Sequence, residues 1–324
     1  MGSETLSVIM ANYNHGVFLD GCLEAICTQS FLPKEFIIVD DGSTDNSVTI
    51  IEGFIKKHPK LNIILLRNET NRGVTYSINR AFDQATGDYV FWPASDDQIL
   101  PGFFEQSMEI LSEHPEAGLC CADSRCLLDE NKLVENKRFL SERPRYFSPN
   151  EVVKLYKKEA FTPVIPSTVV IKRSVLKELG GYIEQFKWSC DSFAHNVASF
   201  RAGICYVPEI LAVVRIHDAQ YGSVHAKQGR LERGVIKLMI DTLLTPEYTD
   251  VLPKFQAVAP FSFYPWEVLM VVLGKRAYWG FFSTKLLRFA LFDKFVRRLL
   301  LRLLPEAFCR FVINKARGLR KRGL

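Results

Sequence analysis

The sequence lacks the cysteine spacings of a metal site or a disulfide framework. Its eight cysteines include no C-x-x-C pair and no ligand-like set with histidine, so neither a zinc site nor a disulfide framework is indicated. No signal peptide is expected at the start of the chain either, because strand-like residues begin at Leu6. From these absences we expect the protein to work in the cytoplasm.

Two nucleotide-binding loops are also missing. No G-x-G-x-x-G follows the first apolar run and no G-x-x-x-x-G-K-[ST] occurs anywhere, which disfavours a dinucleotide fold and a P-loop NTPase. No stretch of ~18 residues is free of charge and proline, so a membrane-spanning helix is not expected. The 48% hydrophobic content and ordinary glycine and proline numbers are those of a globular protein.

The net charge of +5 is unevenly distributed along the chain. Residues 285–324 hold twelve Lys or Arg against two acidic residues, a net charge of +10, which leaves −5 for residues 1–284. A mildly acidic body with a strongly basic tail favours an anionic surface as the partner of the tail. The same split argues against a body that binds nucleic acid.

Four apolar runs alternate with helix-like patterns in the first hundred residues. The runs are 6–11, 36–39, 61–66 and 89–92, and the polar segments that follow them are 12–14, 40–41, 67–72 and 96–97. This alternation predicts a largely parallel sheet covered by helices on both faces. Ligands of such sheets bind outside the carboxyl ends of the strands, so the polar segments are expected to converge on one crevice.

Several longer motifs occur in a fixed order. They are SVIMANYNHG, FIIVDDGSTDNS, NRGVTYSINRA and GDYVFWPASDD, followed by WSCDSF and RIH. Over residues 5 to about 217 the chain resembles an inverting family-2 glycosyltransferase of GT-A fold, of the bacterial type that makes polysaccharides or lipid-linked glycans. The resemblance implies a Rossmann-like, mostly parallel central sheet flanked by helices over residues 1–224. A mainly helical region is then expected over 225–324.

The resemblance also implies a nucleotide site. The aspartate before the glycine of the second motif reads the nucleobase in that family, and here it is Asp41; an Asx turn is the alternative role for this residue. Arg72 stands where the family has a nucleotide-contacting residue, and its alternative is a plain surface arginine. Ala11 and Tyr13, at the end of the first strand, complete the nucleotide contacts that the resemblance implies.

A divalent cation, Mn²⁺ or Mg²⁺, is the cofactor that the resemblance implies. The D-x-D motif of the family falls on residues 95–97, where Ser95 replaces the first acidic residue. Asp97 is expected to bind the metal and Asp96 to hold ribose hydroxyls or a water on the metal, although the departure at Ser95 leaves the division of roles open. His217, in the R-x-H element, is expected to complete the metal shell; a structural histidine is the alternative.

Asp191 matches the general base of the resembled family. An inverting transfer needs one carboxylate to take the proton of the acceptor hydroxyl while that oxygen attacks C1 of the sugar. Asp191 also lies at the start of a predicted helix, where an N-cap role is the alternative. Residues 137–166, which are basic and proline-rich, are expected to recognise the acceptor or to serve only as a connection.

Two functions are compatible with these patterns. The first is an enzyme that transfers a sugar, as a hexosyltransferase would, from a nucleotide-sugar donor to a glycan or lipid-linked acceptor, with a UDP-sugar favoured by frequency in the family. The second is a non-catalytic nucleotide-sugar-binding module attached to a membrane or partner through the tail. The base at Asp191 favours the enzyme, because a binding module does not require it.

The basic tail predicts an amphipathic helix that lies on the inner face of the cell membrane. At ~100° per residue, one face carries Phe289, Phe292, Val296, Leu299, Leu300 and Leu303, and the other carries Arg288, Lys294, Arg297, Arg298 and Arg302. Such helices lie among lipid headgroups and are attracted to anionic lipids. The alternatives are a helix packed on the catalytic domain and an RNA-binding segment at 317–322.

Deletion of residues 285–324 should therefore release the protein from anionic liposomes while turnover of a soluble acceptor analogue persists. Cosedimentation measures the first effect and nucleotide release the second. A truncated chain that still sediments like the full chain would place the anchor elsewhere, and one that unfolds would show that the segment is packed.

Overall fold

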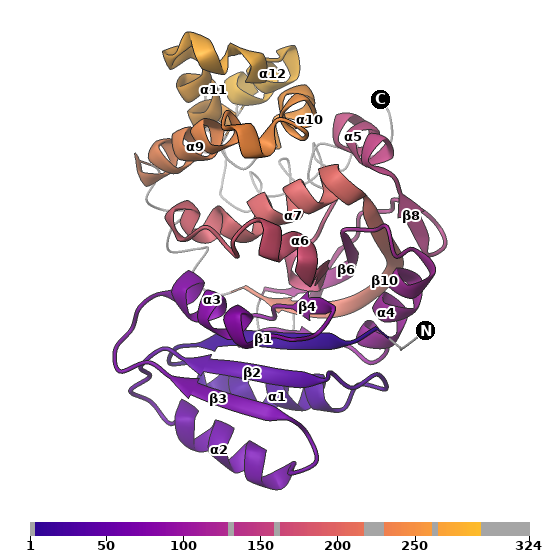
Figure 1. Cartoon of the computed structure of the whole chain (residues 1–324), viewed down its shortest axis with the longest axis vertical. Helices are drawn as coiled ribbons and strands as arrows, with labels where there is room; N and C mark the ends of the chain where they lie inside the picture. The colour runs from indigo at the N-terminus through magenta and orange to yellow at the C-terminus, as the bar shows by residue number, and fades with distance from the viewer. Residues whose placement is uncertain (1–3, 129–132, 159–162, 217–229, 261–264, 293–324) are drawn as a thin grey trace. The chain divides into compact units, whose positions relative to one another are not determined.

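The structure is a computed structural model that describes residues 4–128, 133–158, 163–216, 230–260 and 265–292. The chain divides into two compact units (Figure 1). The first comprises Met1–Asn150 and Val164–Val224, and the second comprises Glu151–Pro163 and His225–Leu324. Within the described residues, no helix combines the length and apolarity needed to cross a membrane.

The first half of the central sheet is parallel. It consists of β1 (Leu6–Asn12), β2 (Glu35–Asp40), β3 (Ile63–Arg67) and β4 (Tyr89–Phe91) in the order β3-β2-β1-β4. The indigo and purple arrows of β1, β2 and β3 lie side by side in Figure 1. β2 and β4 are buried throughout and β1 almost throughout, which explains their continuous apolar runs, while β3 at the sheet edge is only half-buried.

Each of these strands except the last is followed by a helix that the apolar spacing predicted. The helices are α1 (Gly16–Cys27), α2 (Ser47–Lys57) and α3 (Val74–Gln84). In α1 the buried residues Leu19, Leu23 and Ile26 recur every three or four positions and form one stripe. The helices connect parallel strands, and this confirms the predicted Rossmann-like α/β architecture.

The second half of the sheet is mixed. It adds β5 (Gln98–Ile99), β6 (Leu119–Leu127), β7 (Leu133–Asn136), β8 (Arg145–Phe147), β9 (Val170–Lys172) and β10 (Ile204–Arg215). The sheet continues in the order β4-β9-β6-β10-β5; β6 and β10 are parallel, and β9, β5, β7 and β8 pair antiparallel with their neighbours. The helical elements here are α4 (Phe103–Glu113), η1 (Pro166–Thr168), α6 (Arg173–Glu178), η2 (Glu184–Ser189) and α7 (Cys190–Ala202).

The sequence patterns underestimated two features of this half. The alternation of side chains indicates a strand only over 213–217, whereas β10 runs from Ile204 and has bulges between Val207 and Ala212, where its register with β6 shifts. The bulge breaks the alternation of buried and exposed residues on which the prediction depended. β8 lies inside a region that was predicted to be aperiodic, because a three-residue strand carries too little pattern to detect.

The second unit is helical, as predicted for the C-terminal region. It contains α9 (Arg230–Leu243), η3 (Pro246–Tyr248), α10 (Leu252–Val258), α11 (Pro265–Gly274), η4 (Arg276–Phe281) and α12 (Thr284–Leu291), together with most of α5 (Pro149–Lys158). Its core contains the fully buried side chains of Ile240, Phe255 and Phe281. The short apolar run at 268–273 is part of α11, and α10 lies where only a connection was expected.

The first part of the basic tail packs inside this unit. Leu286 and Ala290 of α12 are buried, and Lys285 Nζ donates to the carbonyl oxygen of Tyr156, at 2.8 Å. A deletion that begins at 285 therefore removes part of a core, and one that begins at 293 tests the membrane anchor more cleanly. Residues 293–324, with most of the predicted amphipathic face, lie outside the described part of the chain.

Phe91, at the end of β4, is a central residue of the core in the first unit. It is fully buried, and its ring meets those of Phe103 and Phe104 in edge-to-face contacts with centroids 5.0 and 5.5 Å apart. The acidic loop with Asp96 and Asp97 lies between Phe91 and Phe103 in the chain. The position of this loop therefore depends on the packing of the three rings.

We expect Phe91→Ala to lower the free energy of unfolding by about 3–5 kcal/mol, because it leaves a cavity among rings that cannot collapse fully. Urea unfolding followed by circular dichroism measures the loss. Val17→Ala, at a position that is 86% exposed, is the control and should change stability by less than about 0.5 kcal/mol. Equal effects of the two substitutions would contradict this account of the core.

Candidate active site

The carboxyl ends of β1 and β2 are joined by side-chain hydrogen bonds. Asn12 and Asp40 are paired in register, and Asn12 Nδ2 donates to Asp40 Oδ1 at 3.0 Å. In the loop after β1, Asn14 adopts a left-handed conformation with φ 53°, and its Oδ1 accepts from the backbone N–H of Thr44 at 2.8 Å. These bonds hold the two loops together at the end of the sheet, where a ligand of this fold class binds.

Ala11 and Tyr13 flank Asn12 at this position. Ala11 is half-buried at the end of β1, whereas the Tyr13 ring is exposed just after the strand. An exposed aromatic ring at a strand end is available to stack on a flat ligand. The structure thus places both predicted nucleotide-contacting residues at the crevice end of the sheet.

Asp41 organises the loop between β3 and α3. Its carboxylate accepts from Asn68 Nδ2 at 2.6 Å, from the backbone N–H of Arg72 at 2.9 Å and from that of Gly73 at 2.8 Å. The residue is buried. Three donors leave one of the roughly four acceptor positions of a carboxylate for a ligand N–H. Asp41 therefore holds the loop in the described chain, beyond the nucleobase role that the sequence predicted.

Gly42 allows that loop to pass close to Asp41. Its φ of 74° suits glycine, and a Cβ there would lie 2.8 Å from the carbonyl carbon of Thr70. Arg72, on the same loop, is exposed, and its guanidinium lies 4.5 Å from the ring centroid of Tyr76. The stacked guanidinium is oriented by Tyr76, so this arginine is more constrained than an ordinary surface arginine.

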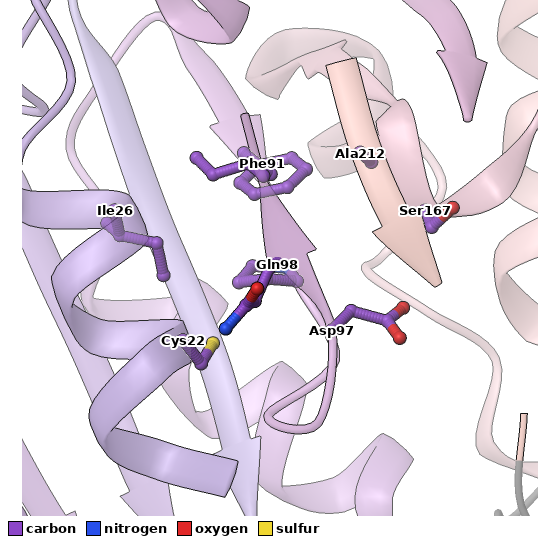
Figure 2. A pocket seen from close by; sticks show the side chains of 9 residues that line it. Cys22, Ile26, Phe91, Asp97, Gln98, Ser167 and Ala212 are labelled. Carbon is purple, nitrogen blue, oxygen red and sulfur yellow. The ribbon is translucent and has the colours of Figure 1, made fainter. Parts of the chain in front are cut away.

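The acidic loop after β4 carries two adjacent buried carboxylates, Asp96 and Asp97. The backbone N–H of Arg215 donates to Asp97 Oδ1 at 2.9 Å, and Arg215 Nε donates to the carbonyl oxygen of Asp96 at 3.1 Å. Figure 2 shows the Asp97 carboxylate turned toward the strand that carries Ala212, which is β10. The end of β10 and the acidic loop are therefore held together.

The environment of Asp97 disfavours its charge. Burial, and secondly the negative charge of Asp96, raise the pKa of Asp97 to about 8, despite the hydrogen bond from Arg215. A small pocket beside this residue is lined mainly by apolar side chains, among them Cys22, Ile26 and Phe91 (Figure 2). A cation bound to the two carboxylates would compensate for the unfavourable charge.

The carboxylate pair fits Mg²⁺ or Mn²⁺ as part of a shared site. Within the described residues no group of three or more His, Cys, Asp or Glu side chains is arranged to hold a metal ion by itself. A hard cation nonetheless binds through one or two carboxylates when phosphate and water supply the remaining oxygens. His217, the third predicted ligand, lies outside the described residues; the last described strand before it ends at Arg215, beside Asp97.

His15 is a site residue that the sequence patterns missed. Its Nδ1 lies 2.7 Å from Ser95 Oγ, in the acidic loop. The His15 ring packs edge-on against the Phe18 ring. The guanidinium of Arg215 lies 5.0 Å from the centroid of the Phe18 ring. The serine that departs from the D-x-D pattern thus has a specific partner. The only signal in the sequence was the position of the histidine in the polar loop after the first strand.

Asp191 lies in the first turn of α7 and is half-buried. Its Oδ1 accepts from the backbone N–H of Ser192 at 2.5 Å, and burial raises the pKa of its carboxyl group to about 6. Ser189, not Asp191, occupies the N-cap position. A carboxylate with a raised pKa is a stronger base than an ordinary aspartate and is still ionised at neutral pH.

Contacts with α3 position the start of α7. Thr75 Oγ1 lies 3.6 Å from the thiol sulfur of Cys190, which precedes Asp191. Asn79 and Tyr182 form a reciprocal pair, in which Asn79 Nδ2 donates to the Tyr182 carbonyl at 2.7 Å and the Tyr182 N–H donates to Asn79 Oδ1 at 2.9 Å. The first turns of α3 therefore connect the Asp41 loop with α7, the helix that carries Asp191.

A model of the family described as "Glycosyl transferase family 2" matches residues 7–180. Among curated proteins, the chain is 35% identical over 119 residues to the uncharacterized glycosyltransferase YibD of Escherichia coli, covering 36% of this chain and 34% of YibD. It is 28% identical over 125 residues to a Campylobacter jejuni enzyme named GalNAc(5)-diNAcBac-PP-undecaprenol beta-1,3-glucosyltransferase, covering 39% of each. The aligned region thus spans little more than a third of either relative.

Two solved structures have a similar fold. TarS 1-349 of S. aureus in complex with UDP aligns with a TM-score of 0.60 at 22% identity, covering 79% of this chain and 70% of that one. The mannosyltransferase PcManGT of Pyrobaculum calidifontis in complex with GDP-Man and Mn²⁺ aligns with a TM-score of 0.61 at 17% identity, covering 99% and 86%. At these identities the likeness establishes the fold.

The raised pKa of Asp97 predicts a particular pH dependence of stability without metal. The folded chain holds this proton up to about pH 8, whereas the unfolded chain releases it near 3.8. The folded state therefore binds more protons between these values, and the free energy of unfolding falls as pH rises through this window. We expect Asp97→Asn, which still accepts the Arg215 hydrogen bond, to remove this part of the decline.

Urea unfolding between pH 5 and pH 8 in the presence of chelator measures the slope. Added Mn²⁺ should then stabilise the wild type at pH 8 and not the Asn variant, by mass action on the folded state. Asp83→Asn, at an exposed position of α3, is the control and should behave like the wild type. An unchanged slope in Asp97→Asn would mean that the Asp97 carboxyl group does not cause the decline of stability with pH.

Proposed function

The chain belongs to glycosyl transferase family 2 and is a glycosyltransferase of GT-A fold, and from this we propose that it transfers a sugar with inversion from a nucleotide-sugar donor to a glycan or lipid-linked saccharide. A UDP-sugar is the proposed donor. The UDP complex of TarS supports this choice, whereas the GDP-Man complex of PcManGT makes GDP-sugars the main competitor. The C. jejuni relative, named for a polyprenyl-linked substrate, supports a lipid-linked acceptor.

The observation that carries the proposal is that the start of α3 contacts both Asp41 and the start of α7. Gly73 donates to Asp41, and Thr75, two residues later, contacts Cys190 beside Asp191. The residue proposed to read the base and the residue proposed to activate the acceptor are thus connected through one short segment. Such an arrangement keeps the donor and the base in fixed relation, which a displacement at C1 requires.

In the proposed mechanism each residue has one task. Asp41, with Ala11, Tyr13 and Arg72, holds the nucleotide, and Asp191 takes the proton of the acceptor hydroxyl as its oxygen attacks C1. Asp96 is proposed to hold the ribose.

Asp97 and His217 are proposed to hold Mn²⁺ or Mg²⁺. When bound, the ion supplies positive charge against the leaving nucleoside diphosphate. The second function considered from the sequence, a binding module without catalysis, is not favoured by the glycosyltransferase relatives.

A panel of UDP-, GDP- and dTDP-sugars, with released nucleotide as the readout, tests the proposal. We expect turnover with one nucleotide class, with Mn²⁺ or Mg²⁺ present, and its loss in excess chelator. Partial restoration of a His217→Ala variant by high Mn²⁺ would support the ligand role of that histidine. Full activity in chelator would refute the metal-dependent mechanism.

The proposed location is the cytoplasmic face of the cell membrane, with the basic tail as the anchor. The support for it is the net charge of +10 over residues 285–324. Confinement to the surface would raise the local concentration of a lipid-linked acceptor. Deletion of residues 293–324, which spares the buried residues of α12, is the test of this location.

Asp191→Asn should reduce transfer by about 10²-fold or more while donor affinity stays nearly unchanged, because an amide keeps the shape but cannot accept the proton. The wild-type rate should also fall about tenfold per pH unit below about pH 6, where Asp191 becomes protonated. Rates at saturating donor across pH 4.5–8 measure both effects.

The Asn variant should lose this acid limb, and Asp83→Asn should keep it. An Asn variant with more than about a tenth of the wild-type rate would exclude Asp191 as the base.

A further inference from the structure

A short segment of the second unit exposes large apolar side chains. Trp279 in η4 is 56% exposed, Phe282 directly after η4 is 42% exposed, and Leu273 at the end of α11 is 53% exposed. All three lie within ten residues of the chain. Tryptophan and phenylalanine are costly to leave in water, so their concentration in one segment indicates a surface that contacts something else.

The geometry of η4 fixes which side chains point outward. A 3₁₀-helix has three residues per turn, so residues three apart lie on the same edge. Tyr278 and Phe281 are buried, and Tyr278 donates its hydroxyl proton to Asp241 Oδ1 of α9 at 2.6 Å. The edge that carries Arg276, Trp279 and Phe282 is exposed instead. The outward aromatic pair is therefore held by the packing of its neighbours.

Cations are in excess along this segment of the sequence. Between Glu267 and Asp293 the sequence contains no acidic residue, but it contains Lys275, Arg276, Lys285 and Arg288. Lys275 and Arg276 lie in the exposed segment itself. Lys275 is within 3.4 Å of Asp241 Oδ1, so part of its charge is compensated. Arg276 is exposed and lies three positions before Trp279 in the sequence, on the same edge of η4.

We propose that this edge, formed by Arg276, Trp279 and Phe282, is a membrane-contact surface that inserts its two aromatic rings among the headgroups of anionic lipids. Tryptophan and phenylalanine are the side chains that favour the boundary between headgroups and acyl chains, and flanking cations add attraction to anionic lipid. The excess of cations over acidic residues between Glu267 and Asp293 fits such a surface. This surface belongs to the described residues of the second unit.

The test uses the full chain, so that the tail is present in every variant. The Trp279→Ala/Phe282→Ala double variant should bind phosphatidylglycerol vesicles about tenfold more weakly than the wild type, because the two rings that insert into the lipid are lost. Cosedimentation measures the partition. Leu133→Ala/Phe139→Ala removes two apolar side chains of similar exposure, 51% and 67%, from the first unit and should bind like the wild type.

A second measurement localises the contact. Vesicles with brominated acyl chains should quench tryptophan fluorescence in the wild type and in Trp266→Phe, and much less in Trp279→Phe. Vesicles of pure phosphatidylcholine should bind more weakly, since they carry no net charge to attract the cations. Unchanged melting temperatures of the variants would show that the losses are not due to unfolding.

Three results would overturn the proposal. The first is equal binding of the double variant and the wild type, which would leave the tail as the whole anchor. The second is shielding of Trp279 from acrylamide in the lipid-free full chain, which would mean that another part of the chain covers this edge. The third is a change of oligomeric state in the double variant with unchanged vesicle binding, which would identify a protein interface.

Discussion

Two like charges in a buried loop set the main physical constraint on this protein. Asp96 and Asp97 are adjacent in the chain and both buried. Ionising the second carboxyl group is therefore unfavourable, because water does not solvate its charge and the first charge repels it. The chain compensates only in part, through the Arg215 backbone N–H to Asp97. What remains must be balanced by a proton or by a cation. The acidic loop is therefore least stable when both carboxyl groups are ionised, which is the state that binds a divalent ion. Such a compromise is common at functional sites.

The start of α3 is the mechanical junction of the site. The N–H of Gly73, at the start of this helix, donates to the Asp41 carboxylate, and Thr75 contacts Cys190. Asn79 holds the loop before η2 through its hydrogen bond to Tyr182. A small displacement of this helix would move Asp41 and Asp191 together. Because three loops depend on one rigid element, the geometry of the site is set by a helix and not by the loops themselves.

The second unit adds a different kind of surface to the catalytic unit. It buries its own aromatic core around Phe255 and Phe281, yet leaves Trp279 and Phe282 in water beside cations. An unpaired aromatic edge is costly for a free protein and useful for one that works at an interface. With the basic composition of the last forty residues, this edge is consistent with an enzyme whose acceptor is held in a membrane.

The sequence by itself determined the α/β alternation, the acidic loop after β4 and the place of Asp191 in the first turn of α7, because each depends on residues close together in the chain. Only the tertiary structure decided that His15 meets Ser95, 80 positions away, and that Asn79 pairs with Tyr182, 103 positions away. It also decided the length of β10 and the second role of Asp41 as an acceptor for a distant loop. Periodicity records which face of an element is buried, but it carries no information on which distant donor meets which acceptor.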